Sequence, residues 1–191
     1  MTTVSARYLD IAQRAKPDLD AIFAAGGPPD VDALVGFEFR GWNQPRATAL
    51  LGIRKFIKAF YSGGDGRTSG CNTPVAQNGL DGEWLPKPSA EHPKRYAFFQ
   101  VDRADPEAAD ESRHRAVLLD YGRGGNRSYD VARILRDYLV RVDPGSDDLL
   151  LGKAYFVVGG RRLASSYFLI ERYGPLPDAD ALAARKWRMP L

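Results

Sequence analysis

Charged and phenolic residues lie within apolar, strand-like segments of this chain, and their chemistry is the clearest functional signal in the sequence. Lys153 shares an alternating face of its segment with Leu151 and Tyr155. A cation facing a barrel interior would pair with a carboxylate or hold an anionic ligand. The alternative is that these charges face solvent and that the tyrosines are ordinary core residues. The candidate ligand-binding residues on these grounds are Arg40, Trp42, Tyr121, Arg136, Tyr138, Lys153, Tyr155, Tyr167 and Arg172.

The sequence contains no specific catalytic or metal-binding motif. Its two histidines, His92 and His114, lie in separate segments, and Cys71 is the only cysteine. No ligand set has metal-like spacing, so we expect no metal and no cofactor. The segment GRGGN lacks the ending of a phosphate-binding loop and indicates a glycine-rich turn. Catalytic residues therefore stay unassigned.

Composition indicates an ordinary globular protein. The chain has 191 residues, of which 44% are hydrophobic and 27% are charged. The 27 basic and 24 acidic residues give too small an excess to indicate nucleic-acid binding. No apolar run has the length of a membrane span, and the single cysteine fits a reducing compartment, so we expect a cytoplasmic protein. The oligomeric state is not indicated.

The strongest structural signal is a pair of β-rich runs joined by Gly159-Gly160. Two glycines fit the positive φ angles of a tight hairpin turn, so we predict a hairpin over 149–172. The run RDYLVRVDP before it extends the hairpin to a three-stranded antiparallel meander over 136–171. Other strands are expected at 34–42, 96–102 and 115–121, with short strands around Val75 and Trp84.

Helices are predicted mainly before the strands. Ser5 is a typical N-cap for a first helix, and Pro17 can begin a second helix that ends at Gly26-Gly27. A third helix is predicted over 45–61, with Ile53 and Ile57 on its apolar face and basic residues on the other.

Two segments near the C-terminal half complete the helix predictions. Residues 129–139 fit either a helix or a strand, and we prefer a short helix that ends near Leu135. Asp178 can cap a last helix that continues through Lys186.

Together these elements predict a mainly β (α+β) fold. We expect an antiparallel, calycin-like β-barrel with N-terminal helices, a helix near the barrel mouth and a short C-terminal helix. Closure is expected because seven or eight short strands would otherwise leave exposed edges. We expect one domain, 1–191, with an N-terminal helical segment 1–33, a barrel core 34–173 and a C-terminal tail helix 174–191.

Several segments resemble, in order and spacing, the bacterial GXWXG-motif proteins with their companion domain of unknown function. These segments are GFEFRG, LLGIRKFIKAFY, AVLLDYG, RDYLVRVDP, LLLGKAYF and YFLIER, and they cover about residues 34–172. The resemblance implies a small calycin- or lipocalin-like barrel and no established reaction. The chain departs from the first motif, because Phe39 replaces the tryptophan and Phe37 the first glycine, whereas Gly41 is kept.

The leading functional hypothesis is a barrel that binds a small apolar or amphipathic ligand, such as a fatty acid. Aromatic residues would line the barrel, and a cation would hold the polar end of the ligand. A metal-independent enzyme that uses a Tyr-Arg or Tyr-Lys pair in the same barrel is the alternative. A structural or protein-interaction domain is the third hypothesis.

Overall fold

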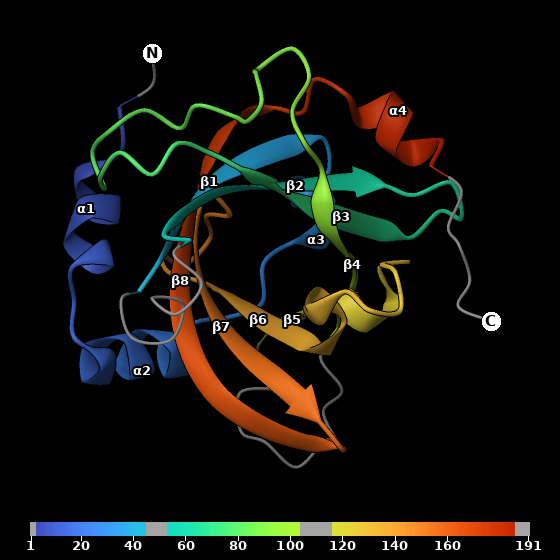
Figure 1. Cartoon of the computed structure of the whole chain (residues 1–191). Coiled ribbons are helices and arrows are strands. Elements are labelled where there is room, and N and C mark those ends of the chain that lie inside the picture. Colours follow the sequence, from blue (N-terminus) through green and yellow to red (C-terminus); the bar gives the residue numbers. More distant parts are fainter. Residues whose placement is uncertain (1–2, 45–52, 104–115, 186–191) are drawn as a thin grey trace.

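A computed structural model describes residues 3–44, 53–103 and 116–185, and its core is a closed barrel of eight antiparallel strands (Figure 1). Each strand pairs with the next along the chain, and β8 pairs with β1. The predicted mainly β, calycin-like barrel is therefore confirmed. The strands are β1 (Phe37–Asn43), β2 (Lys55–Ser62), β3 (Thr68–Pro74), β4 (Tyr96–Arg103), β5 (Val117–Asp120), β6 (Leu135–Arg141), β7 (Leu149–Val158) and β8 (Arg161–Pro175).

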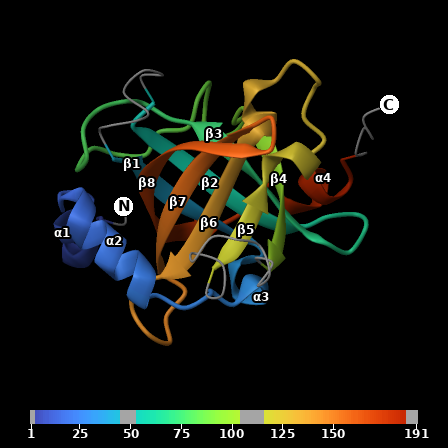
Figure 2. The same ribbon diagram turned by 90° about the horizontal axis from the view of Figure 1, so that it is seen from below.

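Short helices cover the barrel from outside and below. Helix α1 packs against β8, α2 against β7 and α4 against β2. Helix α3 lies at one end of the barrel, which we call the lower end, and its Leu34 is fully buried in the interior cluster (Figure 2). The helices are α1 (Ala6–Ala12), α2 (Lys16–Ala25), α3 (Val31–Leu34) and α4 (Ala179–Ala183), with 3-10 turns η3 (Tyr121–Arg123) and η4 (Val131–Ile134) at the upper end.

Local sequence signals explain the two long helices. The hydroxyl oxygen of Ser5 accepts a hydrogen bond from the Tyr8 amide at 3.0 Å, which caps α1 as predicted. Pro17 lies in the first turn of α2, where its missing amide proton costs nothing. The chain leaves α2 at Gly26, whose close approach to the Val140 side chain leaves no room for a Cβ atom.

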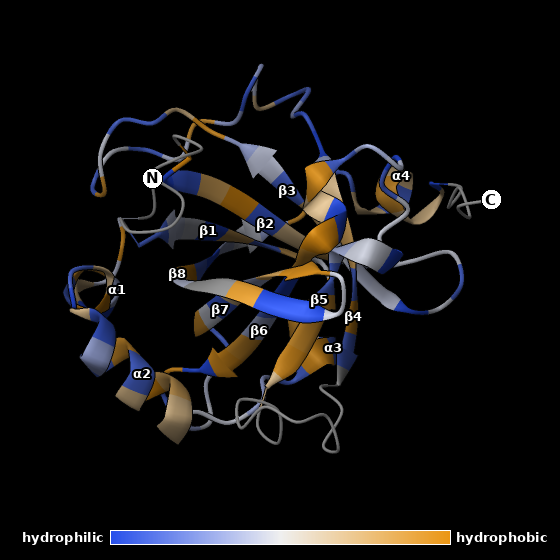
Figure 3. Cartoon of the chain, turned by 60° about the horizontal axis from the view of Figure 1, so that its bottom comes forward, coloured by the Kyte–Doolittle hydropathy of each residue, from blue (hydrophilic) through white to orange (hydrophobic). Residues whose placement is uncertain are grey.

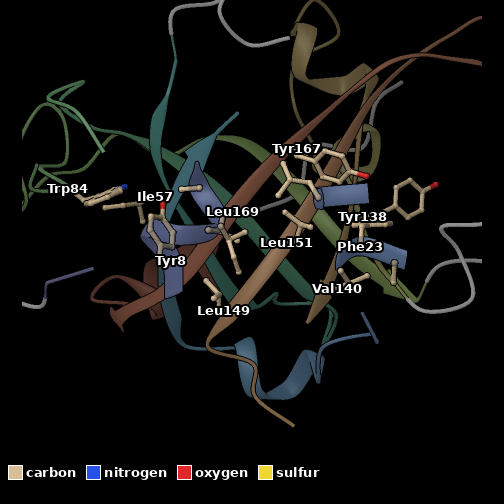
Figure 4. Close-up of a cluster of buried hydrophobic side chains, with 14 of the residues drawn as sticks. Tyr8, Phe23, Ile57, Trp84, Tyr138, Val140, Leu149, Leu151, Tyr167 and Leu169 are labelled. Carbon is tan, nitrogen blue, oxygen red and sulfur yellow. The ribbon is translucent and has the colours of Figure 1, made fainter. Parts of the chain in front are cut away.

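Both faces of the barrel wall are buried over much of the sheet, so the protein has two apolar layers. The interior layer includes Phe39, Phe60 and Phe99. The outer layer lies between the strands and the N-terminal helices, where Tyr8 packs edge-on against Trp84 and the ring of Phe23 is tilted against that of Tyr167 (Figure 4). Hydrophobic residues accordingly run along strands and helices, whereas the loops are mostly hydrophilic (Figure 3).

The prediction of a helix over 45–61 is wrong for residues 55–61. Residues Lys55–Ser62 form strand β2, and residues 45–52 lie outside the described part of the chain. The segment KFIKAFY has apolar residues on both faces of the strand because both faces are buried, and this pattern is easily mistaken for an amphipathic helix.

Other local predictions agree more closely with the structure. Gly159 and Gly160 have φ angles of 57° and 74° and form the predicted turn between β7 and β8. The ambiguous segment 129–139 forms the short helix η4 followed by strand β6, as we preferred. Cys71 lies in β3 and is fully buried.

Candidate functional site

A charged centre lies inside the otherwise apolar barrel. The Lys58 ammonium group donates a hydrogen bond to the Tyr121 hydroxyl at 2.6 Å, and Tyr121 donates to Asp137 Oδ2 at 2.8 Å. The Lys58 Nζ atom also lies 3.4 Å from the same carboxylate oxygen. The amide Nδ2 of Asn72 donates to the Tyr121 hydroxyl at 3.4 Å. We call these four side chains, Lys58, Asn72, Tyr121 and Asp137, the interior polar centre.

Aromatic rings surround the ammonium group. The Nζ atom of Lys58 lies within 4.8 to 5.5 Å of four ring centroids, those of Phe56, Phe99, Tyr121 and Phe168. Such distances allow cation–π attraction, which partly replaces the lost hydration of the charge. Aromatic side chains from several strands therefore enclose the Lys58 ammonium group inside the barrel.

Three of these rings rest on glycines of the neighbouring strand. Phe56 is the cross-strand partner of Gly41, Phe99 of Gly70, and Phe168 of Gly152. A Cβ atom at any of the three glycines would lie 2.1 to 2.3 Å from the ring of its partner. The glycines therefore let the rings lie against the barrel wall, which leaves the space near the axis to the Lys58 side chain.

Burial controls the protonation of the polar centre. Desolvation lowers the pKa of Lys58, and it raises the pKa of Asp137 despite the attraction of the nearby ammonium group. Burial, together with the charge of Asp137, raises the pKa of Tyr121 well above its usual value. Tyr121 therefore keeps its proton and serves as a hydrogen-bond donor.

Strand alternation and one tight turn place the polar centre. Lys58 on β2 and Asn72 on β3 are direct cross-strand partners, so both side chains share the inner face. Tyr121 begins η3, a turn capped by the carboxylate of Asp120. Within the predicted glycine-rich turn GRGGN, Asn126 bonds to the backbone of both Phe98 and Tyr121. These bonds fix Tyr121 at the upper end of the barrel.

Of the nine predicted site residues, Tyr121 alone belongs to the interior polar centre. Arg40 lies on the outer face of β1 beneath α1, where its Nε atom donates to Glu171 at 2.8 Å and its guanidinium contacts the Trp84 ring. Trp42 lies on the same outer face and stacks with Arg54. The prediction that these side chains line the barrel interior is wrong, because α1 and the segment around Trp84 also bury the outer face.

Four further candidates form a separate outer cluster against α2. The Tyr167 hydroxyl donates to Asp20 at 2.6 Å, and Lys153 Nζ lies 3.6 Å from the same carboxylate. Tyr138 and Tyr155 pack edge-on beside them. We expected Lys153 on an interior face, but the inner positions of β7 are Leu150, Gly152 and Ala154.

Arg136 and Arg172 are each held by an acidic neighbour. Arg136 Nη2 lies 3.2 Å from Asp120 on the outside of the sheet. Arg172 donates to Asp148 at 2.6 Å, and its guanidinium lies over the Phe37 ring at the lower end. Neither reaches the polar centre.

Lys58, Asn72 and Asp137 were missed by sequence reasoning. Lys58 was assigned to the basic face of a helix, because both faces of β2 are buried and its sequence gives no clear alternation of polar and apolar residues. Asp137 falls in the segment whose helix or strand character was ambiguous.

A surface pocket of about 180 Å³ lies outside the barrel wall beside β2. Its lining residues include Lys55, whose ammonium group donates to Asn78 Oδ1 and to the carbonyls of Gly82 and Glu83. The Gln77 side chain is bonded to the Lys55 backbone in both directions. These polar groups hold the loop to the strand, so the pocket is a weaker candidate than the polar centre.

Among residues 3–44, 53–103 and 116–185, no group of three or more His, Cys, Asp or Glu side chains is placed to hold a metal ion. In the same ranges, no helix is long and apolar enough to cross a membrane. No protein-family model and no curated protein matches the chain.

Proposed function

We propose that the barrel binds a small amphipathic molecule whose polar end meets the interior polar centre. The observation that carries this proposal is the Lys58–Tyr121–Asp137 group itself, with Lys58 2% and Asp137 4% exposed. Burying an ion pair is expensive, and apolar side chains of similar size would fill a structural core as well or better. A charged group retained at that cost is typical of a functional site.

Asn72 supports a ligand at this position. Its Oδ1 atom is buried and, within the described residues, has no hydrogen-bond partner. A buried acceptor without a donor costs about 1 to 3 kcal/mol. A ligand hydroxyl would donate a hydrogen bond to Asn72 Oδ1, and a ligand oxygen would accept a hydrogen bond from the Lys58 ammonium group.

The charges of the polar centre favour a neutral polar group over a carboxylate. Asp137 lies 3.4 Å from Lys58 Nζ and already compensates its charge. A ligand carboxylate would add a second negative charge beside Asp137. We therefore propose an apolar molecule that ends in a hydroxyl or carbonyl group, rather than the carboxylate clamp expected from the sequence.

We propose that such a ligand enters the barrel at its upper end. Leu34 of α3 is fully buried in the interior cluster at the lower end. At the upper end, the interior is covered by half-buried side chains, namely Tyr96, Ala132, Leu135 and Ala154. Ligand entry would require these side chains and the Phe56 and Phe168 rings to move aside.

Titration calorimetry with decanol and decanoate tests the proposal. We expect decanol to bind more tightly, and Lys58→Met to weaken decanol binding by about 1.5 to 3 kcal/mol, the usual worth of a hydrogen bond to a charged group. Lys153→Met, on the outer face, is the matched control and should leave affinity unchanged. Equal affinity of the parent and Lys58→Met would contradict the role of the polar centre.

A metal-independent reaction on a carbonyl compound is the second candidate, and the contact between Lys58 and Tyr121 favours it. A desolvated lysine with a lowered pKa is a nucleophile. Its neutral amine would attack an aldehyde carbon to give a carbinolamine. Asp137 would accept the two protons that nitrogen loses in turn and pass them to the aldehyde oxygen, the first as the carbinolamine forms and the second as the hydroxyl leaves as water and an imine results. Tyr121 would keep its proton and donate a hydrogen bond to that oxygen.

Reductive trapping separates this reaction from simple binding. Decanal with cyanoborohydride should alkylate Lys58 in preference to the more exposed Lys153, as located by peptide mass mapping. Tyr121→Phe should slow the alkylation of Lys58 while leaving that of Lys153 unchanged. Preferential alkylation of Lys153 would remove this candidate and leave the binding proposal intact.

We also propose that the chain belongs with the GXWXG-motif proteins and that it is cytoplasmic. The barrel supports the resemblance to the GXWXG-motif proteins, because a calycin-like barrel is what that resemblance implies. Cys71 is a buried free thiol whose burial raises its pKa to about 12, and it is the only cysteine of the chain. A single cysteine cannot form an internal disulfide, which fits a cytoplasmic location.

A further inference from the structure

We propose that the upper end of the protein docks onto an anionic membrane surface. The docking surface consists of the tip of the β7–β8 hairpin and the neighbouring loop that leads into η4. Its residues are Arg127, Tyr129, Val131, Val158, Arg161 and Leu163.

Exposed apolar side chains gather at this end. In the described part of the chain, six large hydrophobic residues are exposed, and four of them belong to the docking surface. Their exposed fractions are 74% for Tyr129, 67% for Val131, 51% for Val158 and 50% for Leu163. Clustered exposure of this kind marks an interaction site, whereas single exposed apolar residues are normal.

Strand pairing brings the two segments together. Leu135 at the start of β6 pairs with Phe156, and Phe156 pairs with Leu163 across the hairpin. The turn η4 precedes Leu135 directly and contacts β7. Figure 2 shows the hairpin and this loop at the same end, opposite α3.

Arginines flank these apolar residues. Segments 127–134 and 156–163 together contain four arginines and one aspartate, Asp130. The Asp130 carboxylate caps η4 by accepting from the Ala132 amide. Arg161 is exposed and pairs across the turn with Val158. Near the hairpin tip, hydrophilic and hydrophobic stretches of the strand adjoin one another (Figure 3).

This combination fits an anionic lipid surface better than a second copy of the chain. Basic residues are attracted to acidic headgroups, while tyrosine and short apolar side chains insert at the interface. A two-fold contact between two copies would instead bring like charges together. The inference goes beyond the proposed function and does not require it, although a membrane would be a natural source of an apolar ligand for the barrel.

Vesicle co-sedimentation tests the proposal on the full chain without added ligand. The probes are vesicles of phosphatidylcholine alone and of phosphatidylcholine mixed with phosphatidylglycerol. We expect binding to the mixed vesicles only, and weaker binding at high salt because of screening. Arg161→Glu should lower the affinity about fivefold or more, and Val158→Asp with Leu163→Asp should abolish binding.

Two matched controls keep the test specific. Leu85 is exposed to the same 50% as Leu163 but lies in the segment between β3 and β4, outside the docking surface, so Leu85→Asp should bind like the parent. Arg67→Glu, in the turn between β2 and β3, is the corresponding charge control. The Val158→Asp, Leu163→Asp variant should still bind decanol like the parent, which separates this inference from the proposed function.

Three results would overturn the proposal. The first is an absence of binding to the mixed vesicles. The second is equal binding by the parent, Arg161→Glu and the Val158→Asp, Leu163→Asp variant. The third is a concentration-dependent dimer without vesicles that the Leu163→Asp substitution dissociates, because the surface would then be an interface between two copies.

Discussion

Lys58 and Asp137 are 79 positions apart in the chain, yet they meet inside the barrel and share the hydroxyl group of Tyr121. Burial acts on both partners toward the neutral form, since it lowers the pKa of the lysine and raises that of the aspartate. The pair therefore lowers the stability of the fold relative to an apolar interior, and its effect on stability can be measured.

Replacing both Lys58 and Asp137 should stabilise the protein or leave its stability unchanged, whereas replacing Asp137 alone should destabilise it. In Asp137→Leu, the Lys58 ammonium group loses its counter-charge, and we expect a loss of roughly 3 kcal/mol or more in the free energy of unfolding. Lys58→Met combined with Asp137→Leu should be at least as stable as the parent. Urea unfolding measures both. A double variant as unstable as Asp137→Leu would mean that the ion pair is needed for the fold.

The stability advantage of that double variant should depend on pH. At pH values between the lowered pKa of Lys58 and the ordinary value of 10.5, the lysine is neutral in the folded protein but protonated in the unfolded chain. In this range the stability of the parent rises with pH, because the unfolded state binds more protons. Between 3.8 and its raised pKa, Asp137 keeps a proton that the unfolded chain loses, so parent stability falls as pH rises. The advantage should be largest between these windows. Urea unfolding of the parent and of the double variant, measured from acid to alkaline pH, tests this prediction. A stability advantage of the double variant that is smallest near neutral pH would contradict it.

Turn chemistry and alternation made much of the barrel predictable from the sequence. Gly159-Gly160 has one good explanation, a hairpin turn, and Phe37 and Phe39 share a strand face as their spacing indicates. The cap at Ser5 and the break at Gly26 similarly act through their nearest neighbours in the chain. Signals of this kind depend on local physics and need no knowledge of the partner strand.

The candidate site was harder to predict because it depends on which strand face points inward. On β7, Leu151 packs in the outer layer and Leu150 in the inner one, so hydrophobicity alone cannot tell the two faces apart. Lys153 was placed inside for this reason. Lys58 was missed because a strand buried on both faces lacks a clear period of two. Its pairing with Asp137 is a long-range contact that no local pattern encodes.

Hydrogen exchange should divide the β7–β8 hairpin into a slow base and a fast tip. Leu150 and Ile170 at the base are fully buried cross-strand partners, so their amides should exchange only on global unfolding. Amides near the exposed Val158 should exchange through local opening. The turn amides of Gly63–Arg67 provide the fast reference within the same sample. Exchange at the base as rapid as in that turn would contradict the assignment of the hairpin to the core.

The contact between Gly152 and Phe168 should make even a single methyl group costly. In Gly152→Ala, the new Cβ atom would lie 2.1 Å from the Phe168 ring, which itself packs against Phe56 and Lys58. We expect a loss of about 1 to 3 kcal/mol in the free energy of unfolding, as is usual for overpacking. Gly174→Ala is the control, because its Cβ atom would meet nothing within 4 Å.

A second substitution identifies the ring as the cause of that loss. In the Gly152→Ala variant, Phe168→Leu removes the ring atoms that clash with the new methyl group. Phe168→Leu should therefore lower the free energy of unfolding less in that variant than in the parent, which a double-mutant cycle records as a favourable coupling energy. The four unfolding free energies from urea titration give the coupling directly. If the effects of the two substitutions on the free energy of unfolding were simply additive, Gly152 would be needed for its backbone conformation alone. The contact with the Phe168 ring would then not explain why a glycine is present.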